Sequence, residues 1–165
     1  MAQAVDLLLL GAGQMLTCRT PHGEPKRGAA LSDPGLVTNG AVAISNGAIL
    51  AAGEREQVER VVAGSEIGSV IDAGGRILLP GWVDPHTHAV FGDYRSDEYE
   101  ARIRGDSYLE IERRGGGIMR TVRGVRESGE ERLFDLSSRR LFRMLTDGTT
   151  TIEIKTGYGL DLTNE

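Results

Sequence analysis

Two segments with the composition of strands, residues 82–90 and 149–156, are joined by a long connection that contains a helical pattern. Within residues 124–147, Leu133, Leu136 and Met144 fall near one face of a helix, and Gly148 is placed to end it. A strand, a crossover helix and a second strand in one sheet make the two strands parallel. The second half of the chain is therefore predicted to be α/β.

The first 79 residues show short strand patterns that are separated by turns. The predicted strands are residues 5–10, 41–44, 48–52, 70–71 and 76–79. Asn46-Gly47 lies between two of them, and Asn-Gly between apolar runs is the strongest short hairpin signal. Residues 19–40 are predicted to be an irregular loop and residues 54–63 a short helix. This part is expected to be a β-rich module that ends at Pro80-Gly81.

The connection between the two later strands is charged and rich in glycine. Residues 92–117 are predicted to be a long loop with one helical turn at residues 108–113. Gly115–Gly117 is interpreted as a flexible active-site loop, because no Gly-Lys-Ser/Thr motif of a phosphate cradle follows it. The arginines between residues 113 and 126 have glutamates beside them at positions 110, 112 and 127, and they are interpreted as a solvated face or an oligomer contact.

The composition excludes several classes of protein. The chain carries 19 basic and 24 acidic residues, a net charge of −5, and is a poor candidate for binding a phosphate backbone. Its one cysteine, Cys18, excludes an internal disulfide framework and fits a reducing compartment. No stretch approaches the roughly 18 apolar residues of a membrane span. We therefore expect a cytoplasmic protein with no nucleic-acid or membrane partner.

The segment DPHTH at residues 84–88 is the sharpest chemical signal. Side chains two apart on a strand share a face, so His86 and His88 would present two imidazoles side by side, with Asp84 placed to orient a ligand. The alternative is a pair of ordinary strand-end histidines. A catalytic zinc usually has at least three protein ligands. The missing ligands are an Asp or Glu of this chain or, as we prefer, residues beyond 165, since His22 is interpreted as a solvated loop side chain.

Residues 80–88, PGWVDPHTH, resemble the first-strand signature of the amidohydrolase superfamily of metal-dependent hydrolases. Further segments are similar to the imidazolonepropionase family: VFGDYRSDEYE at 90–100, GDSYLEI at 105–111, GGGI at 115–118 and GTTTIEIKTGYGL at 148–160. The resemblance is dense from residue 71 to 165 and faint before it. Two positions depart from the family pattern. Asp93-Tyr94 stands where Gly and a small polar residue are usual, and Thr156 stands where Ser is usual.

The resemblance implies hydrolysis of 4-imidazolone-5-propanoate to N-formimidoyl-L-glutamate, a step of histidine degradation, by metal-activated water. It implies one Zn²⁺ or Fe³⁺ per full-length subunit, with His86 and His88 as ligands. It also implies that Arg95 binds the substrate carboxylate and that Tyr158 contacts the substrate. A guanidinium fork suits a carboxylate. Without the resemblance, Arg95 would be interpreted as a surface arginine, and Tyr158 equally well as a rim aromatic.

The fold implied is an N-terminal β-sandwich-type module followed by a (β/α)₈ TIM barrel. Residues 1–79 would be the N-terminal part of the sandwich domain. Residues 80–165 would be only the first strands and helix of the barrel, because a closed barrel takes roughly 250 residues. Glu153 and Lys155 are interpreted as supporting polar residues of the barrel. The proton-transfer residues are expected beyond residue 165, so these 165 residues alone are expected to be inactive and poorly soluble.

Two alternatives stay open at this point. One is another amidohydrolase that acts on a cyclic amide, or an aminohydrolase that acts on a nucleobase-like ring. The other is a non-catalytic fragment that folds as a small β-module and binds a partner. For the enzyme, we expect a small-molecule substrate and a homodimer of the full-length protein.

Overall fold

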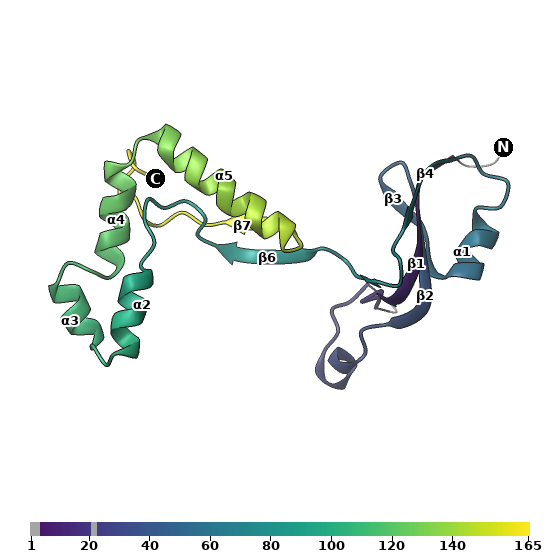
Figure 1. Ribbon diagram of the computed structural model, residues 1–165, viewed down its shortest axis with the longest axis horizontal. Helices are drawn as coiled ribbons and strands as arrows, with labels where there is room; N and C mark the ends of the chain where they lie inside the picture. Colours follow the sequence, from purple (N-terminus) through teal and green to yellow (C-terminus); the bar gives the residue numbers. More distant parts are fainter. Residues whose placement is uncertain (1–3, 21–22) are drawn as a thin grey trace. The chain divides into compact units, whose positions relative to one another are not determined.

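The computed structural model describes residues 4–20 and 23–165, and the predicted α/β class is confirmed. The chain divides into two compact units, Met1–Pro80 and Gly81–Glu165. Figure 1 shows the strands of the first unit in one sheet and most of the helices in the second unit. Each unit is described by itself.

A five-stranded sheet forms the first unit. Its elements are β1 (Val5–Leu16), the short 3₁₀ helix η1 (Gly28–Ser32), β2 (Leu36–Ser45), β3 (Ala48–Glu54), α1 (Arg55–Val61), β4 (Ile67–Asp72) and β5 (Ile77–Leu78). The order β3-β2-β1-β4 places the longest strand inside the sheet, and β5 also pairs with β1. β2 and β3 are antiparallel neighbours, whereas β4 and β5 run parallel to β1. The described residues of this unit form this one sheet, and its assignment to a sandwich domain stays a prediction.

The core of this unit lies between the sheet and α1 (Figure 1). β1 and β2 each contribute apolar side chains to it, and the short helix contributes Val58, which is 1% exposed. The six core residues are Val5, Leu8, Ala41, Ala43, Val58 and Val62. The first unit therefore buries an apolar cluster of its own.

The predicted hairpin and short helix of the first unit are confirmed, and two boundaries are wrong. Asn46 and Gly47 both have positive φ, 52° and 73°, as the tight turn between β2 and β3 requires. β1 continues six residues beyond the predicted end, because Gly11, at φ 71°, lets the strand pass through an irregularity in its pairing with β2. β2 begins at Leu36, inside the predicted loop, because residues 36–40 pair with the extended end of β1.

In the second unit, the predicted parallel strand pair is confirmed. The elements are β6 (Trp82–Thr87), α2 (Ser96–Ile103), α3 (Tyr108–Arg113), α4 (Ile118–Glu127), α5 (Glu130–Thr146) and β7 (Thr149–Ile154). β6 and β7 form a two-stranded sheet. Gly148 has φ 103° and lies just after α5, so it ends that helix as predicted.

Two predictions about the helices of this unit are wrong. Residues 92–117 are not one loop, because α2 forms there with Asp97 and Glu98 in its first turn, where carboxylates favour a helix. The predicted helix 124–147 is two helices, α4 and α5, since Ser128 and Gly129 adopt extended conformations between them. The predicted turn at residues 108–113 is confirmed as α3, which begins with a capping box of Ser107 and Glu110.

Candidate functional site

His86 and His88 lie at the carboxyl end of β6, the first on the strand and the second just after it. Their ring centroids are 5.4 Å apart and the rings meet edge to face. Asp84 does not orient either ring by a hydrogen bond in this structure: its Oδ1 accepts the backbone N–H of His86 at 3.0 Å. That hydrogen bond fixes the backbone at the strand end, where the regular pairing of β6 with β7 is interrupted.

The two imidazoles fit a part of a metal site. Nδ1 of His88 is buried and has no hydrogen-bond partner in the described structure, so one ring nitrogen is available to a ligand-binding role. No group of three or more His, Cys, Asp or Glu side chains in residues 4–20 and 23–165 is arranged to hold a metal ion. The described residues therefore offer two candidate ligands and not a complete coordination sphere. His22 lies outside the described residues.

Tyr158 lies in the turn after β7, next to the histidine pair. Its ring centroid is 5.0 Å from that of His88. Gly157 has φ 132°, and a Cβ at this position would be 3.5 Å from Cε1 of His88. The turn thus comes close to His88 at two consecutive residues, which places Tyr158 beside the candidate metal ligand.

The carboxylate of Glu165 holds the turn that carries Tyr158. It accepts hydrogen bonds from the backbone N–H groups of Gly157, Gly159 and Leu160 at 2.9, 3.0 and 2.9 Å. These donors, the Leu160 amide first among them, lower the pKa of Glu165 below its ordinary value of 4.5. Arg126 of α4 also contacts this turn, because its Nε donates a hydrogen bond to the Gly159 carbonyl oxygen at 2.9 Å.

Arg95 lies directly before α2, and its guanidinium keeps most of its hydrogen-bonding capacity. Its one ion pair among the described residues is with Glu98, at 3.6 Å, and its side chain is 36% exposed. An arginine has five N–H donors. A long ion pair with one carboxylate leaves donors for a second, so Arg95 is able to bind an incoming carboxylate.

Glu98 joins Arg95 to the glycine-rich segment, and sequence analysis did not find it. Its side chain is only 12% exposed and lies 3.6 Å from Arg120 as well as from Arg95. Its two oxygens accept the backbone N–H of Gly117 at 3.1 and 3.2 Å. The Gly115–Gly117 segment is therefore tied to the arginine that precedes α2. A glutamate in a charged segment carries no signal for this role in one sequence.

Asp97, beside Glu98, shares Arg120 with it. Arg120 donates to both oxygens of Asp97, and the closer contact is 2.6 Å. This hydrogen bond lowers the pKa of Asp97 below its ordinary value of 3.8 and raises the pKa of Arg120. Asp97 is largely exposed and does not contact Arg95, so it offers a natural control for Glu98.

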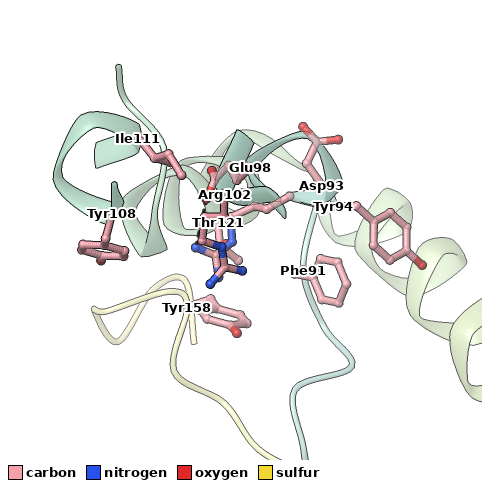
Figure 2. Close-up of a pocket in the computed structure, with 10 residues that line it drawn as sticks. Phe91, Asp93, Tyr94, Glu98, Arg102, Tyr108, Ile111, Thr121 and Tyr158 are labelled. Atoms are coloured by element: carbon pink, nitrogen blue, oxygen red, sulfur yellow. Dashed lines mark ion pairs between the residues drawn. The ribbon is translucent and has the colours of Figure 1, made fainter. Parts of the chain in front are cut away.

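Arg95 and Tyr158, predicted from distant parts of the sequence, line one cavity of about 400 Å³. Figure 2 shows Tyr158 across this cavity from Glu98 and Arg102, with Phe91 beside it. The full lining is Phe91, Asp93, Tyr94, Arg95, Glu98, Arg102, Tyr108, Ile111, Thr121 and Tyr158. His86 and His88 are not in this lining, and the ring contact of His88 with Tyr158 connects the two halves of the site.

Glu153 and Lys155 lie at the end of β7, and the two side chains form an ion pair. The backbone N–H of Lys155 donates to the Thr87 carbonyl at 2.7 Å, which extends the pairing of β7 with β6 beside His86 and His88. Their assignment as supporting polar residues stays a prediction.

No protein-family model matches the chain. The chain is similar to curated proteins named imidazolonepropionase. It is 44% identical over 161 residues to the one from Symbiobacterium thermophilum, 44% over 160 residues to the one from Parabacteroides distasonis, and 41% over 165 residues to the one from Bacillus velezensis. These alignments cover 96–100% of this chain and 37–38% of the relatives, so the chain spans little more than a third of their length.

Among solved structures, the chain is similar in fold to a zinc-bound adenosine deaminase from Xanthomonas campestris. The TM-score is 0.61 at 22% identity, and the match covers 94% of this chain and 30% of that one. The predicted resemblance to imidazolonepropionases is confirmed. No helix in the described part of the chain is long and apolar enough to cross a membrane.

Proposed function

We propose that this chain, which is 44% identical to two imidazolonepropionases over nearly all of its residues, forms the N-terminal part of such an enzyme. The reaction would be hydrolysis of 4-imidazolone-5-propanoate to N-formimidoyl-L-glutamate. One observation carries the proposal. The 5.0 Å contact between the His88 and Tyr158 rings brings a candidate metal ligand to the cavity that Arg95 lines.

The fold that this function requires is the opening of a (β/α)₈ barrel over residues 80–165, after residues 1–79 as part of a β-sandwich domain. The parallel pair β6 and β7, joined through α5, supports the first of these assignments. In such a barrel the catalytic groups lie at the carboxyl ends of the strands. His88 and Tyr158, which follow β6 and β7, lie at that end.

His86 and His88 would hold the metal ion, zinc or iron, together with ligands from beyond residue 165. When bound, such an ion supplies Lewis-acid polarisation of a carbonyl and lowers the pKa of water. The buried, unpartnered Nδ1 of His88 and the edge-to-face position of the two rings support this role. The proton-transfer groups are expected among residues beyond 165.

Arg95 would bind the propionate carboxylate of the substrate, and Tyr158 would contact the substrate between Arg95 and the histidines. A partly exposed guanidinium with one distant acidic partner is suited to a charge-assisted, bidentate contact. Glu98 would hold Arg95 and the Gly115–Gly117 segment around the carboxylate. The enzyme is proposed to be cytoplasmic and a homodimer at full length.

The test of this function is turnover by the polypeptide that carries these residues, purified from its native source. We expect it to convert 4-imidazolone-5-propanoate to N-formimidoyl-L-glutamate, detected by mass spectrometry. Arg95→Ala should lower kcat/KM at least about a hundredfold, because the carboxylate loses a charge-assisted contact of a few kcal/mol. Arg104→Ala, on the exposed side of α2, is the matched control and should leave kcat/KM unchanged.

The alternative functions give different results in the same test. A hydrolase of a neutral cyclic amide, or a ring aminohydrolase, would turn over its own substrate and would not respond to Arg95→Ala. A binding module would show no turnover and would hold no tight metal at His86 and His88.

A further inference from the structure

Arg140 of α5 reaches the segment that joins His88 to Arg95. Its Nη1 donates to the carbonyl oxygens of Ala89 at 3.0 Å and of Phe91 at 2.8 Å. Its Nε donates to the Tyr94 hydroxyl at 3.1 Å. One guanidinium therefore holds the segment of residues 89–94 at three points along its length.

The same guanidinium stacks on the aromatic side chains of this segment. Its Cζ lies 3.5 Å from the centroid of the Phe91 ring and 4.9 Å from that of the Tyr94 ring. The two rings meet edge to face, with centroids 5.2 Å apart and an interplanar angle of 87°. Figure 2 shows Phe91 and Tyr94 at one side of the cavity, with α5 behind Tyr94. Stacking between a cation and ring faces adds to the hydrogen bonds.

Arg140 differs from the arginines beside it in the sequence. Arg139 pairs with Asp135 on the surface of α5, and Arg143 pairs with Asp147. Among residues 4–20 and 23–165, no carboxylate forms an ion pair with Arg140, and its Nη2 is buried without a partner. Arg140 thus contacts carbonyl oxygens, a hydroxyl group and ring faces. These contacts fix the conformation of residues 89–94 and do not neutralise the charge of the guanidinium.

The other side of the segment is fixed by α4. A Cβ at Gly92 would lie 2.3 Å from the Gly124 carbonyl oxygen, so the backbone of the segment is in direct contact with the helix. Residues 89–94 are held between α4 on one side and Arg140 on the other. His88 immediately precedes this segment and Arg95 immediately follows it.

Tyr94 is one of the positions at which the sequence departs from the family pattern. A small polar residue at position 94 would have neither the aromatic ring nor the hydroxyl group with which Tyr94 contacts Arg140. In this chain, the departure supplies an acceptor for Nε and a second ring face for the same guanidinium.

We propose that Arg140, with Tyr94, is a positioning residue that sets the location of Arg95 relative to His88. This inference rests on the proposed function, because it concerns the carboxylate subsite of the same site. Arg140 does not line the cavity that Arg95 and Tyr158 share, and it acts through the segment it holds. Its loss should release Arg95 from its place in the cavity while leaving the Arg95 guanidinium itself intact.

The experiment measures binding of 3-(imidazol-4-yl)propionate and of its neutral carboxamide to the full-length polypeptide that carries these residues, by isothermal titration calorimetry. The ratio of the two dissociation constants is the carboxylate preference. We expect the wild-type chain to prefer the propionate at least about tenfold, from one charge-assisted contact. Arg140→Met should remove most of that preference, about tenfold, because displacing a binding group by about 1 Å costs that much or more.

Three further variants separate positioning from charge and from stability. Arg139→Met, the matched control one residue away, should keep the preference. Arg140→Lys keeps the charge but cannot span two carbonyls and a hydroxyl, so it should lose the preference as Arg140→Met does. Tyr94→Phe removes only the hydroxyl acceptor and should lower the preference about two- to threefold, even where Arg140→Met does not fold.

The outcomes distinguish the inference from the function on which it rests. The positioning role is overturned if Arg140→Met keeps the wild-type carboxylate preference, or if Arg140→Lys and Tyr94→Phe both keep it. The proposed function would still stand in that case. A wild-type chain that does not distinguish the two probes contradicts the carboxylate subsite, and the positioning role is overturned with it.

Discussion

The two units of the chain bury their apolar side chains to different degrees. In the first unit, six residues of the sheet and α1 form a closed core, and Val58 is almost fully buried. In the second unit, Trp82 and Val83 of β6 are 59% and 65% exposed, and Phe134 and Phe142 of α5 are more exposed still. Two strands alone are marginally stable. The first unit is therefore expected to be stable from its own contacts, whereas the second needs further structure beside β6, β7 and α5.

This difference agrees with the proposed barrel. The site residues belong to the unit with the less complete core: His86, His88, Arg95 and Tyr158 all follow Pro80. Their local geometry depends on hydrogen bonds and close backbone contacts more than on a large apolar core. Loss of a buried apolar side chain should therefore cost most in the first unit, and loss of a close backbone contact or a hydrogen bond should cost most in the second.

The largest effect is expected for Leu8→Ala. Leu8 is 4% exposed in the core of the first unit, and removal of a buried leucine side chain costs about 2–5 kcal/mol. Urea unfolding followed by NMR should show the native signals of the first unit disappearing at a lower urea concentration than in the wild-type chain. The urea concentration at which the native signals of Tyr158 disappear should not change.

The control is Phe142→Ala, which removes a side chain that is 67% exposed. It should change the free energy of unfolding by less than about 0.5 kcal/mol. Equal shifts of both units in Leu8→Ala would show that they unfold as one.

The next effect is expected for Gly92→Ala. Its Cβ would meet the backbone of Gly124, which has no flexible end to move aside, so the second unit should lose about 1–3 kcal/mol. The unfolding midpoint of the second unit, measured by circular dichroism, tests this. Gly129→Ala is the control: no atom lies within 4 Å of its Cβ position and its φ is −68°, so it should lose less than about 1 kcal/mol, from the poorer N-cap that Ala provides for α5. Equal stability of the two variants would argue against the packing of residues 89–94 on α4.

A smaller, local effect is expected for Ser107→Ala. The hydroxyl of Ser107 accepts the backbone N–H of Glu110 in the capping box of α3, and removal of such a cap costs about 1 kcal/mol. Hydrogen exchange of the α3 amides should become faster while that of β1 stays the same. Ser138→Ala, in the exposed middle of α5, should not accelerate exchange in its helix. Faster exchange throughout the second unit would mean that α3 is part of a larger cooperative unit.

The smallest effect is the pH dependence of the Tyr158 turn. The pKa of Glu165 lies below its ordinary value of 4.5, so the carboxylate stabilises the turn above that value. This contribution is lost as the pH falls through the lowered pKa and the group is protonated. The amide shifts of Gly157, Gly159 and Leu160 should titrate together in acid, and Glu165→Gln should abolish that titration. Amide shifts that titrate unchanged in Glu165→Gln would place the controlling group elsewhere.

The sequence allowed the α/β class, the Asn-Gly hairpin and the parallel pair β6 and β7 to be predicted, because each depends on short-range patterns or on chain connectivity. The split between α4 and α5 was missed, since Ser128 and Gly129 are tolerated within a helical pattern and are extended here only in context. α2 was missed because its residues are almost entirely polar, with Ala101 as the one buried side chain in the helix.

Within the candidate site, sequence motifs indicated which side chains to consider but not which other residues hold them in place. His86, His88, Arg95 and Tyr158 were predicted from the family resemblance, and their roles stay predictions. Arg140 could not have been found, because an arginine in an amphipathic helix is usually a surface residue. Its contacts with Ala89 and Tyr94 span about fifty residues of sequence, and only the fold brings them together.

The most direct test of the central claim combines turnover with the intact mass of the polypeptide in its native source. We expect imidazolonepropionase activity to copurify with a polypeptide that contains these residues and has a mass well above 17.8 kDa. A native polypeptide of 17.8 kDa that binds no metal at His86 and His88 and does not hydrolyse 4-imidazolone-5-propanoate would contradict it. The chain would then be a non-catalytic module with the sequence of an enzyme.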